Sequence, residues 1–341
     1  MPLAPRRLVI VGVAVTATLL GGCGSGTATL LTEPEVTTST AMATTAAAQH
    51  PFAGETAWIA YQTNKAGEST WLIHPDGTED HQVAPDFSGS LILPNWSPDG
   101  QRLVMTSRGG STEPLYEYDL QTEDYTQLFA CEDPCFGDDE PVYSPDGTKV
   151  AFVRYLGPFT DDGPSDCGLW IGDLATDEVD QITSNDSCDR EYFPRWSPDG
   201  SQLTYWRERP EGTAVFVINA DGTNERQLTD WNMFGGDSDW SPDGTWIVFN
   251  TYPLAAFNFE ARISNLYRIH ADATEIEQLT DYESVEPRAT QPRYTPDGDR
   301  IIFTAVTGSS RELWVMPSAG GEPIVVSAGG IYTHGSWQPQ P

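Results

Sequence analysis

Positive charge is scarce in this sequence, because 18 Lys and Arg residues stand against 50 Asp and Glu residues and the formal net charge is −32. All of the acidic residues follow residue 22. Nucleic-acid binding requires a basic surface, so this composition excludes nucleic acid as the partner. Such a surface keeps a protein soluble and attracts cations or basic partners, but net charge alone does not choose between these.

Long apolar runs are also scarce. The stretch Leu8–Leu20 is interrupted only by Gly and Thr residues, and it follows Arg6 and Arg7. It is shorter than the roughly 20 apolar residues of a membrane-spanning helix. Two glycines end it, which is typical of a cleaved export signal. We therefore predict a signal peptide at residues 1–22 and no further membrane-crossing segment.

The segment Leu20-Gly21-Gly22-Cys23 resembles the lipobox of bacterial lipoproteins. In that family the Cys is acylated and becomes the new N-terminus. The resemblance implies lipid attachment at Cys23 and a location in the cell envelope, anchored on the extracytoplasmic side. The alternative is an ordinary secretory signal in which Cys23 is incidental. Residues 23–51 are rich in Thr and Ala and have little to bury, so we expect a flexible tether.

Cysteine is sparse, and four residues remain once Cys23 is set aside. An even number outside the cytoplasm predicts disulfides. The expected pairs are Cys131–Cys135, around a tight loop, and Cys167–Cys188, at adjacent strands, since both arrangements can bring the Cα atoms within about 7 Å. Cross-pairing of neighbouring loops, such as Cys135 with Cys188, is the alternative.

One five-residue motif recurs along the chain: an aromatic residue, Ser or Thr, Pro, Asp and Gly. The copies begin at Trp96, Tyr143, Trp196, Trp240 and Tyr294, with a degraded sixth copy at Trp337. They start 43 to 54 residues apart, and periods of this size indicate a propeller or a solenoid. Ser, Pro, Asp and Gly in this order suit a tight turn between antiparallel strands. The aspartates are therefore assigned to turns and not to catalysis.

Strand signals surround each copy of the motif. After Trp96 come Leu103-Val104-Met105, Leu115-Tyr116 and Gln127-Leu128, and the aromatic segment is itself a short strand. Four strands per unit make one propeller blade. Before the first motif, residues 58–61 and 71–77 match the second and third strands of a blade, and the segment at Trp337 supplies its first strand. We predict an all-β, six-bladed propeller at residues 52–341, closed by one blade that the two ends share.

These motifs resemble the PD40, or WD40-like, repeats of TolB and of the propellers of prolyl-oligopeptidase-type enzymes. The resemblance covers about residues 52–341 and implies the fold more than the function. TolB carries an α/β domain before its propeller, whereas a Thr/Ala-rich segment precedes it here. In this family the Ser-Pro-Asp-Gly turns share one face, and the longer loops share the opposite face, which opens onto the central channel.

Long loops on a rigid scaffold concentrate binding residues, so we expect function on the face opposite the turns. The residue before each aromatic, just before each inner strand, should line the channel rim: Asn95, Val142, Arg195, Asp239, Arg293 and Ser336. Arg195 and Arg293 could pair with a ligand carboxylate or with Asp239. Two loops there carry apolar side chains that either contact a partner or cover their own blades: Trp231, Met233, Phe234, Phe257 and Phe259.

Signals for catalysis are weak. The sequence has no Gly-x-Ser-x-Gly elbow, so oligopeptidase chemistry is not expected. His334 alone is placed near the channel and is interpreted as a hydrogen-bonded rim residue, not as part of a histidine metal site. Acid pairs could ligate Ca²⁺ or simply be solvated: Asp138 with Asp139, and Asp237 with Asp239.

We therefore expect no cofactor, apart from this option of Ca²⁺. The sequence predicts a monomeric, non-catalytic extracytoplasmic lipoprotein that binds a protein or peptide on the loop-rich face and touches the membrane only through its lipid anchor. The alternative is an envelope or extracellular hydrolase or lyase that acts in the propeller funnel.

Overall fold

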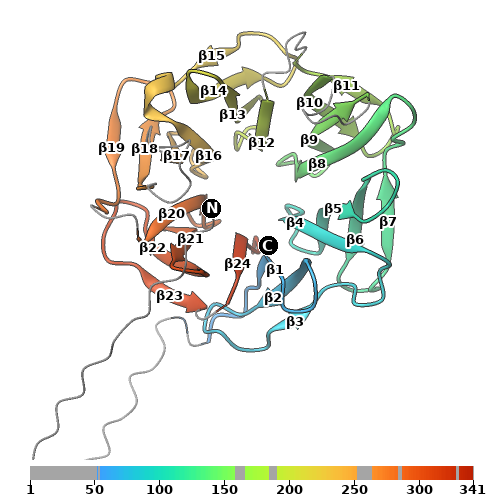
Figure 1. Ribbon diagram of the computed structural model, residues 1–341, viewed down its shortest axis with the longest axis horizontal. Helices are drawn as coiled ribbons and strands as arrows, with labels where there is room; N and C mark the ends of the chain where they lie inside the picture. Colours follow the sequence, from blue (N-terminus) through green and yellow to red (C-terminus); the bar gives the residue numbers. More distant parts are fainter. Residues whose placement is uncertain are drawn as a thin grey trace, which may run out of the picture. The chain divides into compact units, whose positions relative to one another are not determined.

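The computed structural model describes residues 52, 54–157, 166–183, 190–251, 263–282, 286–327 and 330–340. These residues form six four-stranded antiparallel sheets arranged as blades around a common centre (Figure 1). The predicted all-β, six-bladed architecture is thereby confirmed. Cys23, the expected signal peptide and the expected tether lie outside the described residues. Among the residues described, no helix is long and apolar enough to span a membrane.

The first three blades follow one another along the chain, and each runs from an inner strand beside the channel to an outer edge strand. Blade 1 consists of β4 (Ser90–Trp96), β5 (Arg102–Arg108), β6 (Leu115–Asp119) and β7 (Tyr125–Leu128). Blade 2 consists of β8 (Cys135–Tyr143), β9 (Lys149–Leu156), β10 (Asp166–Asp173) and β11 (Val179–Gln181). Blade 3 consists of β12 (Arg190–Trp196), β13 (Gln202–Arg209), β14 (Gly212–Asn219) and β15 (Arg226–Gln227).

The remaining blades complete the ring. A short 3-10 helix, η1 (Trp231–Met233), leads into blade 4, which consists of β16 (Gly235–Trp240), β17 (Trp246–Thr251), β18 (Leu266–His270) and β19 (Ile276–Gln278). Blade 5 consists of β20 (Arg288–Tyr294), β21 (Arg300–Thr307), β22 (Ser310–Pro317) and β23 (Ile324–Ser327). Blade 6 combines β24 (Tyr332–Trp337) with β1 (Ile59–Thr63), β2 (Ser69–Ile73) and β3 (His81–Gln82).

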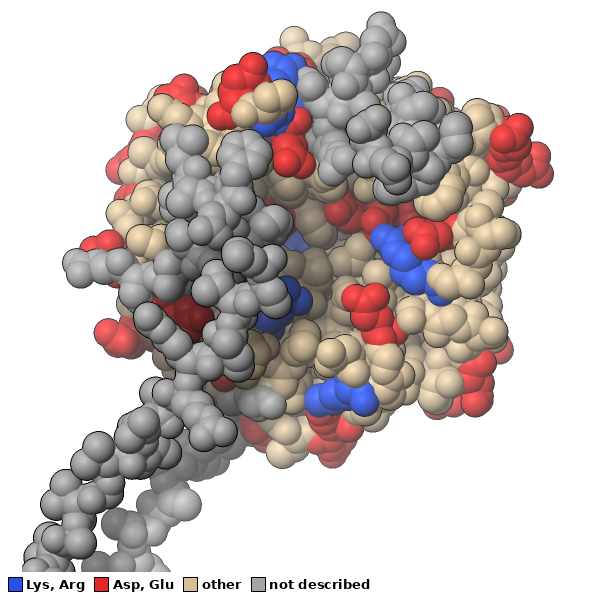
Figure 2. Space-filling view, in the orientation of Figure 1, with Lys and Arg blue, Asp and Glu red and all other residues tan. Residues whose placement is uncertain are grey.

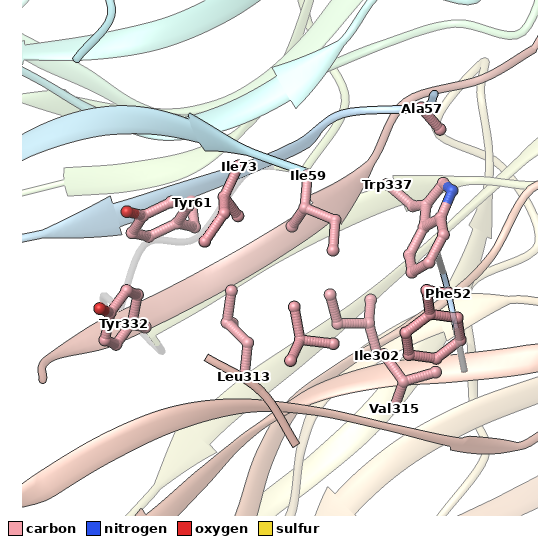
Figure 3. Close-up of a cluster of buried hydrophobic side chains, with 11 residues drawn as sticks. Phe52, Ala57, Ile59, Tyr61, Ile73, Ile302, Leu313, Val315, Tyr332 and Trp337 are labelled. Carbon is pink, nitrogen blue, oxygen red and sulfur yellow. The ribbon is translucent and has the colours of Figure 1, made fainter. Parts of the chain in front are cut away.

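The two ends of the described chain meet in blade 6, as predicted. Ile59 of β1 is paired with Trp337 of β24, and Gln338 N donates to Trp58 O at 2.8 Å. Hydrophobic clusters lie at all six interfaces between neighbouring blades. The cluster between blades 5 and 6 packs Phe52 edge-on against Trp337 and adds Ile302, Leu313 and Val315 from blade 5 (Figure 3). Apolar packing therefore seals the ring where the ends join.

The Ser-Pro-Asp-Gly segments form the expected turns. In the first, Ser97 Oγ donates to Asp99 Oδ1 at 2.5 Å and accepts from Arg102 N at 2.9 Å. Gly100 has φ +66°, and a Cβ at this position would lie 2.7 Å from Pro339 O, so both the backbone and the space require glycine. The same Ser–Asp bond recurs at Ser144, Ser197 and Ser241, and Thr295 replaces Ser in the fifth turn. The aspartates are structural.

The meandering strand order places these turns on one side of the ring, here named the turn face. The connections between second and third strands, and those between each outer strand and the next inner strand, lie on the opposite side, here named the loop face. The aromatic residues that begin the five-residue motifs link neighbouring blades: Trp96 Nε1 donates to Ser336 O at 2.9 Å and Trp196 Nε1 to Val142 O at 3.3 Å. The interpretation of these aromatics as blade-to-blade contacts is thereby supported.

Candidate functional site

All six inner strands contain a bulge at the same place, where the register with the second strand shifts. In each blade, the residue three places before the aromatic of the five-residue motif lies in this bulge: Leu93, Glu140, Phe193, Asp237, Gln291 or His334. Five of the six, all except Asp237, have φ between +53° and +56°. A left-handed backbone is strained for residues other than Gly, and such strain concentrates at functional sites. The bulges therefore mark the channel as the first candidate site.

Side chains from opposite blades meet across the channel. The rings of Phe193 in blade 3 and His334 in blade 6 are stacked with centroids 5.5 Å apart, although β12 and β24 lie on opposite sides of the ring (Figure 1). Gln291 Nε2 lies 2.7 Å from His334 Nε2, and Gln291 Oε1 accepts from Thr304 Oγ1 at 2.9 Å. His334 is thus held in a hydrogen-bonded position, in agreement with its expected role at the rim.

The imidazole of His334 is neutral at physiological pH. Burial, together with the positive charges of Arg195 and Arg311, lowers its pKa to about 3. A neutral imidazole can accept a hydrogen bond from a ligand but contributes no positive charge to the channel.

One guanidinium faces several carboxylates beside this histidine. Arg195 is 3% exposed, and burial lowers its pKa to about 10, against the opposing effects of Asp239, Glu140 and Asp237. Its Nη1 donates to Pro194 O at 2.5 Å, while Nε has no hydrogen-bond partner among the described residues. A buried donor without a partner is costly, so the hydrogen bonding of this guanidinium is incomplete in the free protein.

The carboxylates are poorly solvated. Burial raises the pKa of Asp239 to about 6, against the effect of Arg195, and Asp239 Oδ2 accepts from Tyr294 N at 2.9 Å. Burial and the negative charge of Asp139 raise the pKa of Glu140 well above its usual range, and Glu140 accepts a hydrogen bond from Phe193 N. Titratable groups with displaced pKa values in a concave site are a signature of function.

The channel cluster, defined as Glu140, Phe193, Arg195, Asp237, Asp239, Gln291 and His334, places a buried guanidinium with one unpartnered N–H next to several acceptors. This combination suits a ligand with both polar donors and acceptors, such as a peptide segment. Figure 2 shows a hollow at the centre of the ring, with both basic and acidic side chains beside it.

Arginine side chains bind both members of the predicted acid pair Asp138 and Asp139. Arg154 donates to both carboxylate oxygens of Asp138, at 2.7 and 2.8 Å, and Arg108 Nη2 donates to Asp139 at 2.5 Å. Cys131, Cys135 and Asp138 are the one group with metal-ligand spacing in the described part of the chain. The two cysteines form the expected disulfide, with Cα atoms 5.1 Å apart, so their sulfurs are not free to bind a metal. Ca²⁺ binding stays a prediction.

The second expected disulfide is not tested by the structure. Cys167 is buried in β10, but Cys188 lies outside the described residues.

The aromatic loop before blade 4 corrects one expectation. Phe234 is only 6% exposed, in a left-handed position that ends η1, so it does not present its ring to a partner and instead covers its own blades. Trp231 and Met233 are half-buried, and the Trp231 ring packs 5.6 Å from the ring of Phe216. Phe257 and Phe259 lie outside the described residues.

The residues predicted for the channel rim lie within the inner strands, each directly before the aromatic that ends its strand, and not before the strands as expected. Arg293 in β20 is paired with Ile302, and Asn95 Nδ2 donates to Leu93 O at 3.3 Å. Sequence reasoning placed Glu140, Phe193 and Gln291 at the ends of loops on the loop face but did not single them out as site residues. Each lies three residues before the aromatic of a five-residue motif, the same position as His334 and Asp237. An alignment of the repeats at this position would therefore have identified them as candidates.

Known proteins share the propeller repeats of this chain. Residues 140–252 match the family model described as the TolB beta propeller domain. The repeats within residues 140–252 are therefore of the TolB propeller type. In structure, this TolB-type propeller is similar to TolB from Acinetobacter baumannii, with 20% sequence identity and a TM-score of 0.66 over 83% of this chain and 67% of that one. It is also similar to an oligogalacturonate lyase in complex with manganese, with 21% identity and a TM-score of 0.57 over 79% of this chain and 73% of that one. Such likenesses show the fold.

Three sequence relatives share parts of the TolB-type propeller. An uncharacterized protein of Agrobacterium fabrum is 27% identical over 62% of this chain and 64% of its own length. An uncharacterized peptidase of Bacillus subtilis is 25% identical over 49% of this chain and 29% of its own length. The Tol-Pal system protein TolB of Anaeromyxobacter dehalogenans is 27% identical over 39% of this chain and 28% of its own length. The chain thus spans less than two thirds of each relative.

Proposed function

We propose that this TolB-type propeller is a non-catalytic, lipid-anchored protein of the cell envelope that binds a protein or peptide partner at the channel on its loop face. The observation that carries the proposal is the channel cluster, in which the unpartnered Nε of Arg195 lies among buried carboxylates. Buried groups of this kind are costly to the free protein, and a partner that supplies the missing hydrogen bonds recovers part of that cost. The likeness to a protein named for the Tol-Pal system supports an envelope role.

The alternative, a hydrolase or lyase acting in the funnel, has less support. The matched part of the peptidase relative is 29% of its length, and this sequence has no Gly-x-Ser-x-Gly elbow. His334 is neutral and is held by Gln291, so this residue does not donate a proton near neutral pH.

Partner capture by the full-length protein from membranes tests the proposal. Glu140→Gln keeps the shape of the side chain and replaces its carboxyl group by an amide, so the ring should stay folded while capture weakens about thirtyfold, which corresponds to about 2 kcal/mol. The matched control is Lys149→Ala with Asp272→Ala on the turn face, which should leave capture unchanged. Melting temperatures must accompany each measurement. Loss of capture in the turn-face variant with normal capture in Glu140→Gln would contradict the proposal, because it would place partner binding on the turn face.

The anchor has a separate test. Cys23→Ala should leave the precursor unacylated and uncleaved by the lipoprotein peptidase. Stable anchoring takes at least two lipid signals, which the lipoprotein pathway supplies. Equal fatty-acid labelling of the natural chain and Cys23→Ala would exclude lipid attachment at this residue.

A further inference from the structure

A lysine ammonium is enclosed by three aromatic rings in blade 6. Lys65 lies in the connection between β1 and β2, on the loop face. Its Nζ lies 4.6 Å from the ring centroid of Tyr332, 5.0 Å from that of Trp71 and 5.5 Å from that of Tyr61. The rings belong to three different strands, β24, β2 and β1, so the fold gathers them around one point.

A carboxylate completes the enclosure. Asp80 forms an ion pair with Lys65, and Lys65 Nζ donates to Tyr61 Oη at 3.0 Å. Rings arranged around a cation attract it through their π faces, and the attraction grows as water is excluded. The carboxylate and the phenol oxygen add acceptors for N–H groups, so the enclosure favours a primary ammonium over a quaternary one.

The walls of this cage are held without Lys65. Tyr61 Oη donates to Asp80 Oδ1 at 2.5 Å, and Trp71 Nε1 donates to Ser69 Oγ at 3.1 Å. Tyr61 is fully buried and Tyr332 is 8% exposed, and both belong to the apolar cluster between blades 5 and 6. Figure 3 shows the two hydroxyls pointing the same way, away from the aliphatic side chains of that cluster.

The occupant is less firmly held than the walls. The Lys65 side chain is 29% exposed and belongs to a short connection outside the strands. Solvent screening weakens an ion pair with this exposure, so the three ring contacts and the bond to Tyr61 share in holding the ammonium. A second lysine side chain that makes the same contacts could replace Lys65 without a change in the walls.

We propose that Tyr61, Trp71, Tyr332 and Asp80 form a binding site for a primary ammonium group, and that a lysine side chain of the partner replaces Lys65 in it. The inference rests on the proposed function, because it supplies one contact of the same loop face. The resident Lys65 shows that the cage accepts a lysine side chain, and a net charge of −32 attracts a basic partner as it attracts other cations.

Titration calorimetry with n-butylammonium, which copies a lysine side chain, tests the cage in the full-length protein. Lys65→Ala should bind it saturably, and the natural chain should bind about tenfold or more weakly, because a tethered Lys65 competes at an effective concentration in the millimolar range. Tetramethylammonium should bind Lys65→Ala more weakly, since it has no N–H for Asp80. Adding Asp80→Asn should remove binding.

Folded Lys65→Ala without saturable binding, or binding that Asp80→Asn leaves unchanged, overturns the proposal. If Lys65→Ala does not fold, n-butylammonium should restore folding, and failure to do so counts against the cage in the same way. These results do not depend on partner capture, so the cage and the proposed function can fail separately.

The source of the ammonium needs a second comparison. A lysine peptide should bind Lys65→Ala, and the same peptide with norleucine in place of lysine should not. Vesicles containing phosphatidylethanolamine carry the same ammonium group on a lipid. Binding to these vesicles without binding to the lysine peptide would overturn the assignment to a partner lysine.

Discussion

Acidic side chains on the turn face and in the channel are in opposite environments. Hydrogen bonds from serine hydroxyls lower the pKa values of four turn aspartates: Asp99, Asp146, Asp199 and Asp243. Burial raises the pKa values of Glu140 and Asp239 in the channel. The residue types are the same or closely related, so the difference comes from solvation and hydrogen bonding.

Lowered and raised carboxyl pKa values have opposite consequences for the stability of the fold. A lowered pKa means that folding favours the charged carboxylate, so the turn aspartates stabilise the ring at neutral pH. A raised pKa means that folding disfavours the charge, so the channel acids reduce stability at neutral pH. Buried acids with raised pKa values are candidates for binding, and this supports the proposal that the partner binds at the channel.

The largest expected effect is at a buried ion pair near the loop face. Arg154→Ala leaves the fully buried Asp138 without its partner and should lower the free energy of unfolding by about 3–5 kcal/mol. Arg102→Ala, beside a turn, removes a pair whose arginine is 31% exposed and should cost less than about 1 kcal/mol. Chemical denaturation at neutral pH measures both. Equal losses would show that burial does not distinguish the two faces.

The second prediction uses the raised pKa of Asp239. Its folded pKa of about 6 lies above its ordinary value of 3.8, so stability is fully present below pH 3.8 and is lost as pH rises through 6. That shift corresponds to about 3 kcal/mol. Asp239→Asn should remove this loss, so its stability relative to the natural chain should improve between pH 4 and pH 7.5. If the difference in unfolding free energy between Asp239→Asn and the natural chain were constant across this pH range, the raised pKa of Asp239 would be contradicted.

The third prediction concerns the disulfide on the loop face. Replacing both Cys131 and Cys135 by Ser opens a loop with a sequence separation of 4 residues. The chain-entropy account of so short a loop gives a loss of about 2 kcal/mol, measured as a lower midpoint of denaturation. Peptide mapping without reduction should also find Cys167 joined to Cys188. A peptide that joins residue 131 or 135 to residue 167 or 188 would reject this pairing.

The smallest effect is expected at a single turn. Asp199→Asn weakens the bonds of this side chain with Ser197 Oγ and Ser201 N and should cost about 1 kcal/mol at neutral pH. Because the folded pKa is lowered, this contribution is present above pH 3.8 and is lost as pH falls through the folded value. The cost should therefore shrink in acid, the reverse of the Asp239 profile. A cost that persists at pH 2 would assign it to side-chain shape instead of charge.

Much of the fold could be predicted because local signals repeat. Ser-Pro-Asp-Gly, or Thr-Pro-Asp-Gly in one copy, specifies a tight turn from four adjacent residues, and its five copies identify five of the six blades. The shared blade followed from one unit lacking its first strand and a spare strand at Trp337, both visible in the chain order. Less of the site could be predicted. Phe234 looked available because it lies in a loop, but its backbone conformation returns the ring to the interior, which neighbouring residue types do not reveal.

The sequence by itself determined the number of blades, the turns, the aromatic contacts between blades and the joining of the two ends, because each depends on short-range chemistry or on simple counting. Tertiary structure decided the channel cluster and the cage around Lys65. Phe193 and His334 are far apart in the chain and meet only because the ring closes. The pKa values of Glu140 and Asp239 depend on which distant side chains exclude water from them, and solvation is a property of the assembled ring that no local pattern encodes.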